Sequence, residues 1–143
     1  MDQEKLKKDL NQLWAGVMEN ITFDPLKNNI ILQVKVIENA KEENFKVEFD
    51  GVSAFYWVRN NGNKRFNLPL PDEGDFLELT SIDYFGGGIG EILIESASYE
   101  WAKQYFSSAN FALEIWSSML FIEAKSITIN DKLFEIDHPI LNC

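Results

Sequence analysis

Carboxylates are the side chains of this sequence that could do chemistry, and they gather in one stretch. Between Arg65 and Lys103 there are eight acidic residues and no basic one: Asp72, Glu73, Asp75, Glu78, Asp83, Glu91, Glu95 and Glu100. Residues 1–71 contain ten acids and ten Lys or Arg, whereas residues 72–143 contain thirteen acids and three Lys. The formal net charge of -10 therefore belongs to the C-terminal half. This asymmetry predicts a negative surface field that favours basic partners.

Catalysis by paired carboxylates or metal binding would require tighter spacing than the sequence offers. On one face of a strand, Glu91 and Glu95 would lie ~13 Å apart. Glycoside hydrolysis uses separations of roughly 5–5.5 or 6.5–9.5 Å, which only partners on neighbouring strands, such as Asp83 or Glu114, could reach. The acidic loop at residues 71–75 offers oxygen ligands, but it departs from the EF-hand spacing. We therefore expect no catalytic residue, no metal site and no cofactor.

The counts of histidine and cysteine exclude further site classes. With His138 as the only histidine, a His-dependent triad, a multi-His metal site and a Cys/His zinc site are excluded. Cys143 is the only cysteine, so no internal disulfide can form, which fits a reducing compartment. The glycine cluster at residues 86–90 lacks the Lys and Ser/Thr of a phosphate loop, and we interpret it as a hairpin connection.

Size and hydropathy predict a cytoplasmic protein of one domain, residues 1–143. The first ten residues are polar and charged, so no secretory signal is visible, and no apolar run approaches the ~20 residues that cross a bilayer. Because half of the surface is expected to be acidic, it would repel phosphates. We therefore expect neither nucleic acid nor an anionic membrane as a partner. Composition does not fix the oligomeric state.

The apolar pattern predicts a helix over residues 1–21 and an antiparallel β region over residues 29–137. In the first segment, apolar residues recur at steps of three and four: Leu6, Leu10, Leu13, Trp14, Val17 and Ile21. A loop containing Asp24-Pro25 ends this helix. From residue 29 the period becomes two, with Leu32, Val34 and Val36 on one face. A polar hairpin loop follows at residues 39–43, and then Phe45, Val47 and Phe49 alternate with polar residues as in a half-buried antiparallel strand.

Further strands follow along the chain. Residues 52–59 are apolar on both faces and predict a central strand. Asn61-Gly62 and Asn130-Asp131 are typical of two-residue turns. Residues 99–109 are aromatic and predicted to be irregular. Seven or eight strands against one helix predict an α+β fold, with the N-terminal helix packed on a mostly antiparallel sheet or sandwich.

The aromatic residues beside the acids suggest a surface for a protein partner. Tyr and Trp are enriched at interface hot spots, and an acidic rim would suit a basic partner. The candidate protein-binding residues are Asp72, Glu73, Asp75, Asp83, Glu91, Glu95, Tyr99, Trp101 and Tyr105. The alternative is that these aromatic rings cap the open end of the sheet as part of the core.

Four stretches carry a resemblance to a known family: VKVIEN at 34–39, FDGVSAFYWV at 49–58, ELTSIDYF at 78–85 and LEIWSSMLFIEAKSITIND at 113–131. Together they resemble the YxiG-like proteins of Gram-positive bacteria. Such families resemble small cytoplasmic immunity proteins that accompany polymorphic toxins. The resemblance therefore implies a non-enzymatic inhibitor of a toxin domain, which the acidity predicts to be basic. A small carboxylate-dependent hydrolase and a housekeeping domain of unknown role stay open as alternatives.

Overall fold

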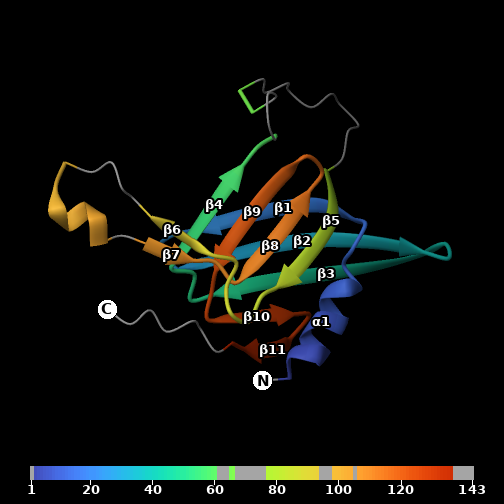
Figure 1. Cartoon of the computed structure of the whole chain (residues 1–143). Helices are drawn as coiled ribbons and strands as arrows, with labels where there is room; N and C mark the ends of the chain where they lie inside the picture. The colour runs from blue at the N-terminus through green and yellow to red at the C-terminus, as the bar shows by residue number, and fades with distance from the viewer. Residues whose placement is uncertain (1, 61–64, 67–76, 94–97, 105, 137–143) are drawn as a thin grey trace.

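The computed structural model describes residues 2–60, 65–66, 77–93, 98–104 and 106–136 (Figure 1). These residues form an α-helix, a 3-10 helix and eleven strands. In chain order they are α1 (Gln3–Asn11), β1 (Gly16–Asp24), β2 (Asn29–Glu38), β3 (Lys41–Asp50), β4 (Ala54–Val58), β5 (Leu77–Tyr84), β6 (Glu91–Leu93), η2 (Glu100–Gln104), β7 (Phe106–Ser108), β8 (Phe111–Ile115), β9 (Ser118–Glu123), β10 (Ser126–Ile129) and β11 (Lys132–Glu135).

Nine of these strands form one antiparallel sheet in the order β11-β10-β3-β2-β1-β5-β8-β9-β4, and β6 pairs with β7 in a second, smaller sheet. The expected class, a helix with a mostly antiparallel sheet, is confirmed. The expected count of seven or eight strands was too low, because the described residues alone form nine strands in the large sheet and two in the small one. Short strands such as β6 and β7 contain too few residues to leave a clear alternating pattern.

The large sheet folds over on itself and encloses the core. Phe49 on β3 and Phe111 on β8 lie four places apart in the strand order, yet their ring centroids are 5.0 Å apart. Phe23 on β1 and Phe55 on β4 are also four places apart, with ring centroids at 4.9 Å. In Figure 1, β1, β2 and β3 lie behind β4, β8 and β9 and cross them. We call β5, β8, β9 and β4 the front layer.

The N-terminal helix is shorter than predicted, and this corrects the expected span of residues 1–21. Helix α1 ends at Asn11, and Gly16 opens strand β1, so Val17 and Ile21 belong to a strand. The backbone reverses at Ala15, with φ 64°, and enters Gly16, where a Cβ atom would lie 2.5 Å from Val34 Cγ1. The tight approach of β1 to β2 therefore ends the helix and moves the start of the β region from residue 29 to residue 16.

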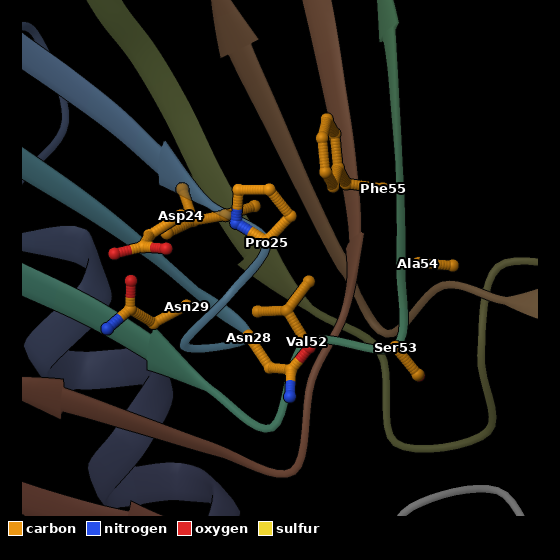
Figure 2. Close-up of a pocket in the computed structure, with 9 residues that line it drawn as sticks. Asp24, Pro25, Asn28, Asn29, Val52, Ser53, Ala54 and Phe55 are labelled. Carbon is orange, nitrogen blue, oxygen red and sulfur yellow. The ribbon is translucent and has the colours of Figure 1, made fainter.

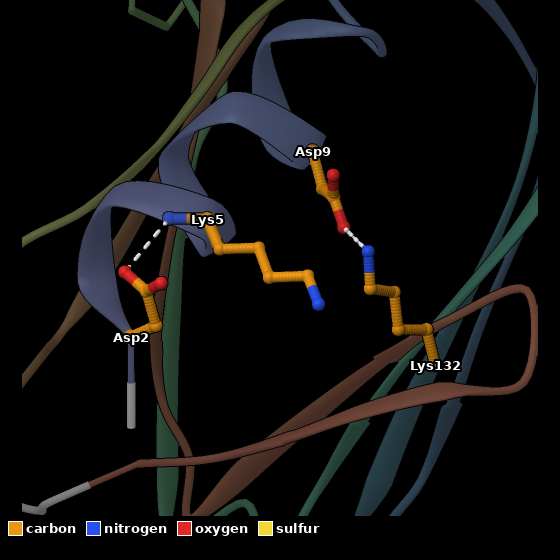
Figure 3. A network of polar contacts seen from close by, with 4 residues as sticks. All are labelled: Asp2, Lys5, Asp9 and Lys132. Carbon is orange, nitrogen blue, oxygen red and sulfur yellow. Dashed lines mark hydrogen bonds and ion pairs between the residues drawn. The ribbon is translucent and has the colours of Figure 1, made fainter.

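Polar contacts fix both ends of α1. The Lys5 backbone N–H donates to Asp2 Oδ1 at 3.2 Å, which caps the helix (Figure 3). Lys132 Nζ on β11 lies 2.8 Å from Asp9 Oδ2. Leu6 and Leu10 are buried in the core on the other side of the helix. The apolar stripe of the helix was thus predicted correctly for Leu6 and Leu10, the members that lie in α1.

Two-residue turns behave as local chemistry predicts. Asn130 and Asp131 join β10 to β11 with φ of 45° and 67°, so this predicted turn is confirmed. Asn39 and Ala40 join β2 to β3 in the same way, with φ of 52° and 63°. The predicted loop over residues 39–43 was too long, because pairing resumes at Lys41. The inward faces of β2 and β3 are as predicted, with Leu32, Val34, Phe45, Val47 and Phe49 buried.

The strand over residues 52–59 lies at the edge of the sheet, and the prediction of a central strand was wrong. Among the described residues, β4 (Ala54–Val58) pairs only with β9. Its residues are apolar on both faces because Phe55 and Trp57 face the core, whereas Tyr56 faces the solvent side of the front layer. An apolar run indicates that both faces of a strand are covered, but it does not indicate how many strands pair with its backbone.

The glycine-rich segment is not a hairpin connection, which corrects that interpretation. Residues 85–90 lead from β5 in the large sheet to β6 in the small one, and β5 and β6 do not pair. Residues 99–109 are more regular than predicted, since they contain η2 and β7. The predicted turn at Asn61-Gly62 lies outside the described residues.

Candidate functional site

The structure describes four of the nine predicted protein-binding residues. Asp83 lies on β5 and Glu91 begins β6, while Trp101 lies in η2 and Tyr99 immediately precedes it. Figure 1 places η2 well apart from β5, at the far end of the β6–β7 sheet. Asp72, Glu73, Asp75, Glu95 and Tyr105 lie outside the described residues, so their part of the acidic surface stays a prediction.

The two described aromatic residues form an exposed pair. The side chains of Tyr99 and Trp101 are 67% and 60% exposed. Their rings stack with centroids 6.2 Å apart at an interplanar angle of 26°. The two rings therefore lie at the surface, and the alternative in which they cap the sheet as part of the core does not hold for them.

Asp83 is brought together with a second carboxylate, as the sequence allowed for neighbouring strands. It faces outward beside Ala112 on β8, two residue pairs away from Glu114. Burial raises the pKa of the Asp83 carboxyl, the Glu114 carboxylate raises it further, and Lys7 on α1 opposes both effects. Asp83 lines a hollow with Lys7 and Trp14, but Glu114 does not. The pair therefore lacks the shared enclosed site in which carboxylates cooperate in hydrolysis.

The free edge of the front layer is the most distinctive surface of the described part of the chain. Strand β4 consists of Ala54, Phe55, Tyr56, Trp57 and Val58, and it contains no charge and no proline. Its register with β9 runs without a bulge from one end to the other. Phe55 is 48% exposed and Tyr56 is 52% exposed. Charges, prolines and bulges are the devices that keep sheet edges from pairing, and β4 has none of them.

A cavity of about 270 Å³ opens beside the start of β4 (Figure 2). We call it the β4 pocket. Its apolar walls come from Pro25, Ile30, Val52 and Phe55, and Asp24 adds a carboxylate. The turn between β1 and β2, the end of β1 and the approach to β4 build it together. A hydrogen bond from the Val52 backbone N–H to the Asn28 carbonyl, 2.9 Å long, holds these segments side by side.

Two acceptor atoms beside the β4 pocket, on the face of the β1–β2 hairpin opposite Phe23 and Ile30, have no donor among the described residues. Asp24 Oδ1 accepts from the backbone N–H groups of Leu26 at 3.0 Å and Lys27 at 3.2 Å, which shapes the turn, while Oδ2 has no such bond. The side-chain oxygen of Asn29 is buried and accepts no hydrogen bond. In Figure 2 this oxygen and the Asp24 carboxylate point toward one another. Leaving a buried acceptor unsatisfied costs about 1–3 kcal/mol.

A buried glutamate joins β4 to the small sheet. Glu123 on β9 is 6% exposed and accepts hydrogen bonds from the Ser53 hydroxyl, the Ser107 hydroxyl at 2.9 Å and the Ser108 backbone N–H. Sequence reasoning missed this residue, although an acid within the apolar run of residues 119–124 was a usable signal. The cluster contains no histidine, and its donors satisfy the carboxylate, so its arrangement is that of an anchor for β4 and β7.

The described part of the chain contains neither a metal-binding cluster nor a helix that could span a membrane. No group of three or more His, Cys, Asp or Glu side chains there could hold a metal ion. No helix in those residues combines the length and the apolar character needed to cross a bilayer. The β4 edge, consisting of Ala54–Val58 and the β4 pocket, is therefore the candidate functional site.

Comparison with known proteins is consistent with the resemblance seen in the strand motifs. The model of the YxiG-like protein family matches residues 6–134. The uncharacterized protein YxiG of Bacillus subtilis (strain 168) is 26% identical over 115 residues, which cover 80% of this chain and 79% of that protein. The region matched by the family model begins within α1, contains β1 to β10 and ends one residue before the end of β11.

Proposed function

Since the chain belongs to the YxiG-like family, we propose from the geometry of its β4 edge that it is a non-enzymatic binding protein for a basic protein partner. More specifically, the partner is a toxin domain, and the chain acts in the cytoplasm as its immunity-type inhibitor. The observation that carries this proposal is strand β4, which pairs only with β9 among the described residues and contains no charge to prevent further pairing.

The mode of binding that suits this edge is strand addition. A partner segment in an extended conformation would bond to the free backbone groups of β4 and extend the front layer by one strand. Phe55 and Tyr56 would then lie under alternate side chains of the added strand, one on each face of the sheet. Aromatic residues of this kind supply much of the binding energy in protein interfaces.

Charge supports a basic partner. The chain has a formal net charge of -10. The β4 pocket is lined by Asp24, and a second cavity, which Trp57 of β4 helps to line, is lined by Glu19. No Lys or Arg of the described residues lines either cavity. Complementary charge speeds association and disfavours wrong partners, with an effect that weakens as salt increases.

Affinity capture from the native host, followed by a growth assay, tests this function. Tagged chain is used as bait and washed first at low salt and then at high salt. We expect a basic protein to be retained at low salt and released at high salt. Expressed alone in a heterologous host, that protein should arrest growth, and co-expression of the chain should restore it. Recovery of no partner at low salt, or a partner whose toxicity the chain leaves unchanged, would overturn the proposal.

A further inference from the structure

We infer that the partner strand received by β4 carries bulky apolar side chains at the positions opposite Phe55 and Trp57, where they complete the core of the chain. This inference rests on the proposed function, because these positions exist only when a strand is added to β4. It goes further by stating the sequence pattern that the partner strand needs, an apolar residue at every second position with any basic residue on the outward face.

The inward face of β4 is incompletely covered by the described residues. Phe55 faces the core, because its partner on β9, Ile122, is fully buried. Phe55 nevertheless stays 48% exposed, and Phe23 of β1, which stacks on it, stays 37% exposed. Trp57, two residues further along β4, faces the same way and is also only partly buried. A residue of an added strand directly opposite Phe55 would have its Cβ atom about 4.5–5.5 Å from that of Phe55, on the same face, and would cover the exposed side of the ring.

The β4 pocket lies beside the same position. It is lined by Ala54 and Phe55 of β4, and its other apolar walls come from Pro25, Ile30 and Val52. In Figure 2, Pro25, Val52 and Phe55 lie on one side of β4. A bulky apolar side chain opposite Phe55 would therefore contact the ring and cover the mouth of this cavity as well, which removes further apolar surface from water.

Charged side chains fit these inward positions less well. On the β1–β2 hairpin, Phe23 and Ile30 form one residue pair and face the core. The next pair, Asp24 and Asn29, faces the opposite side, so its oxygen atoms do not accept hydrogen bonds from a group in the pocket. A cation opposite Phe55 would lose its water without gaining a carboxylate, which is costly.

The outward face of the added strand leaves room for the charge of a basic partner. The residue between the two inward positions would lie opposite Tyr56, which is 52% exposed on the outer side of the front layer. A lysine or arginine there keeps its charged group in water and lays its methylene stem along the aromatic ring. The pattern apolar–basic–apolar is therefore compatible with the proposed basic partner.

Two peptides of equal charge test this inference on the whole chain. The first is Ac-Thr-Val-Lys-Val-Thr-NH2, and the second carries threonine in place of both valines. Threonine is β-branched like valine and also favours strands, but it has a hydroxyl in place of a methyl group. Titrations followed by 1H–15N spectra give the dissociation constants, and we expect the threonine peptide to bind about tenfold more weakly. Equal affinity for the two peptides, or no binding of either at millimolar concentration, would overturn the inference.

The ratio of the two dissociation constants separates direct contact from effects on folding. A variant that only lowers the folded fraction weakens both peptides equally and leaves the ratio unchanged. Phe55→Ala removes the ring that one valine covers, so we expect the ratio to fall from about tenfold to about threefold. Tyr56→Ala, the matched change at the outward-facing neighbour, should leave the ratio at about tenfold. An unchanged ratio in Phe55→Ala, or an equal fall in both variants, would contradict the inference.

The captured partner distinguishes failure of this inference from failure of the proposed function. We expect Phe55→Ala to weaken its binding by about tenfold or more. A partner that binds Phe55→Ala as tightly as wild type, but loses affinity for Tyr56→Lys, would exclude the apolar pattern and leave the proposed function standing. Discrimination between the peptides without any captured partner would have the opposite meaning, because β4 would then recognise apolar side chains although the proposed function had failed.

Discussion

The two ends of the nine-stranded sheet differ in how their edges are protected. Strand β11 carries Lys132 and Glu135 at its ends, and Lys132 is paired with Asp9 on α1 and lies 5.6 Å from the Phe134 ring. Strand β4 carries no charge at all. Since charged residues keep edges from pairing, β11 has a protection that β4 lacks among the described residues. This difference is the reason that the proposed partner is placed at β4.

The two edges are also anchored by different chemistry. The approach to β4 is tied to β9 by the buried Glu123, which accepts from the Ser53 hydroxyl. The end of the sheet at β11 is tied by the Lys132–Asp9 ion pair, whose side chains are 44% and 14% exposed. Buried, fully bonded carboxylates contribute more than ion pairs open to water. The change in the free energy of unfolding on substitution of each anchor therefore distinguishes the two edges.

The largest expected effect is the loss of the Glu123 anchor. Glu123→Ala removes the acceptor of three hydrogen bonds and leaves the buried Ser108 N–H without its partner, which should lower the free energy of unfolding by about 3 kcal/mol. Urea unfolding measures this change. The matched control is Glu114→Ala on the neighbouring strand β8, an exposed glutamate whose loss should cost less than about 0.5 kcal/mol. Similar values for the two variants would show that the buried cluster does not anchor β4.

The next effect compares the two edges in binding. Tyr56→Lys places a charge in the middle of the β4 edge and removes an aromatic contact. We expect it to weaken binding of the captured partner by about 2 kcal/mol, or about 30-fold in affinity. Leu133→Lys is the matched change on β11, where the side chain is 56% exposed, and it should leave affinity within about twofold. Calorimetric titration measures both values. A stronger loss at Leu133 would mean that the partner uses the opposite edge.

A smaller effect is expected at the β11 anchor. Lys132→Ala breaks the ion pair with Asp9 and should lower the free energy of unfolding by less than about 1 kcal/mol, because the pair is open to water. The loss should nearly vanish in 1 M salt, where charges are screened within about 3 Å. Unfolding of Lys132→Ala and wild type at low and high salt tests this point. A loss as large as that at Glu123 would remove the contrast between the two anchors.

The smallest effect is expected at Asp83, whose carboxylate lies on the front layer away from either edge. Because the pKa of Asp83 is raised by burial and then by Glu114, its protonated form is favoured by folding. Its contribution to stability is present below the unfolded pKa of about 3.8 and is lost as pH rises through the folded pKa. Asp83→Asn should therefore stabilise the chain at pH 7 by less than about 0.5 kcal/mol.

The pH dependence of this variant provides the check. The difference in melting temperature between Asp83→Asn and wild type should shrink as pH falls from 7 toward the unfolded pKa. Thermal unfolding at pH 4 and pH 7 measures it. A difference that grows on acidification would mean that Lys7 dominates and that the carboxylate stabilises the folded chain.

Local patterns in the sequence predicted the parts of the fold that local physics determines. The alternation around Val34 and Val47 gave the inward faces of β2 and β3, and Asn130-Asp131 gave a tight turn. The boundary of the helix could not be predicted in this way. Val17 and Ile21 fit a helical stripe as well as a strand, and the close contact of Gly16 with Val34 decides between them only in the folded chain.

The candidate site was less accessible to prediction than the fold. Residues 52–59 are apolar on both faces whether the strand is central or terminal, so the open edge of β4 is a property of the strand order. Asp24 and Phe55 are far apart in the sequence and meet only because the sheet folds over on itself. The acidity of the chain was visible from composition, but the position of β4 at the end of the sheet was not.

Hydrogen–deuterium exchange in the complex with the captured partner tests most directly whether β4 receives an added strand. The amides of Ala54–Val58 and those of Lys132–Glu135 serve as the two probes within one experiment. An added strand should slow exchange in β4 by at least about tenfold, because its free backbone groups gain partners, and leave β11 unchanged. Unchanged exchange in β4, or slowing confined to β11, would contradict this account.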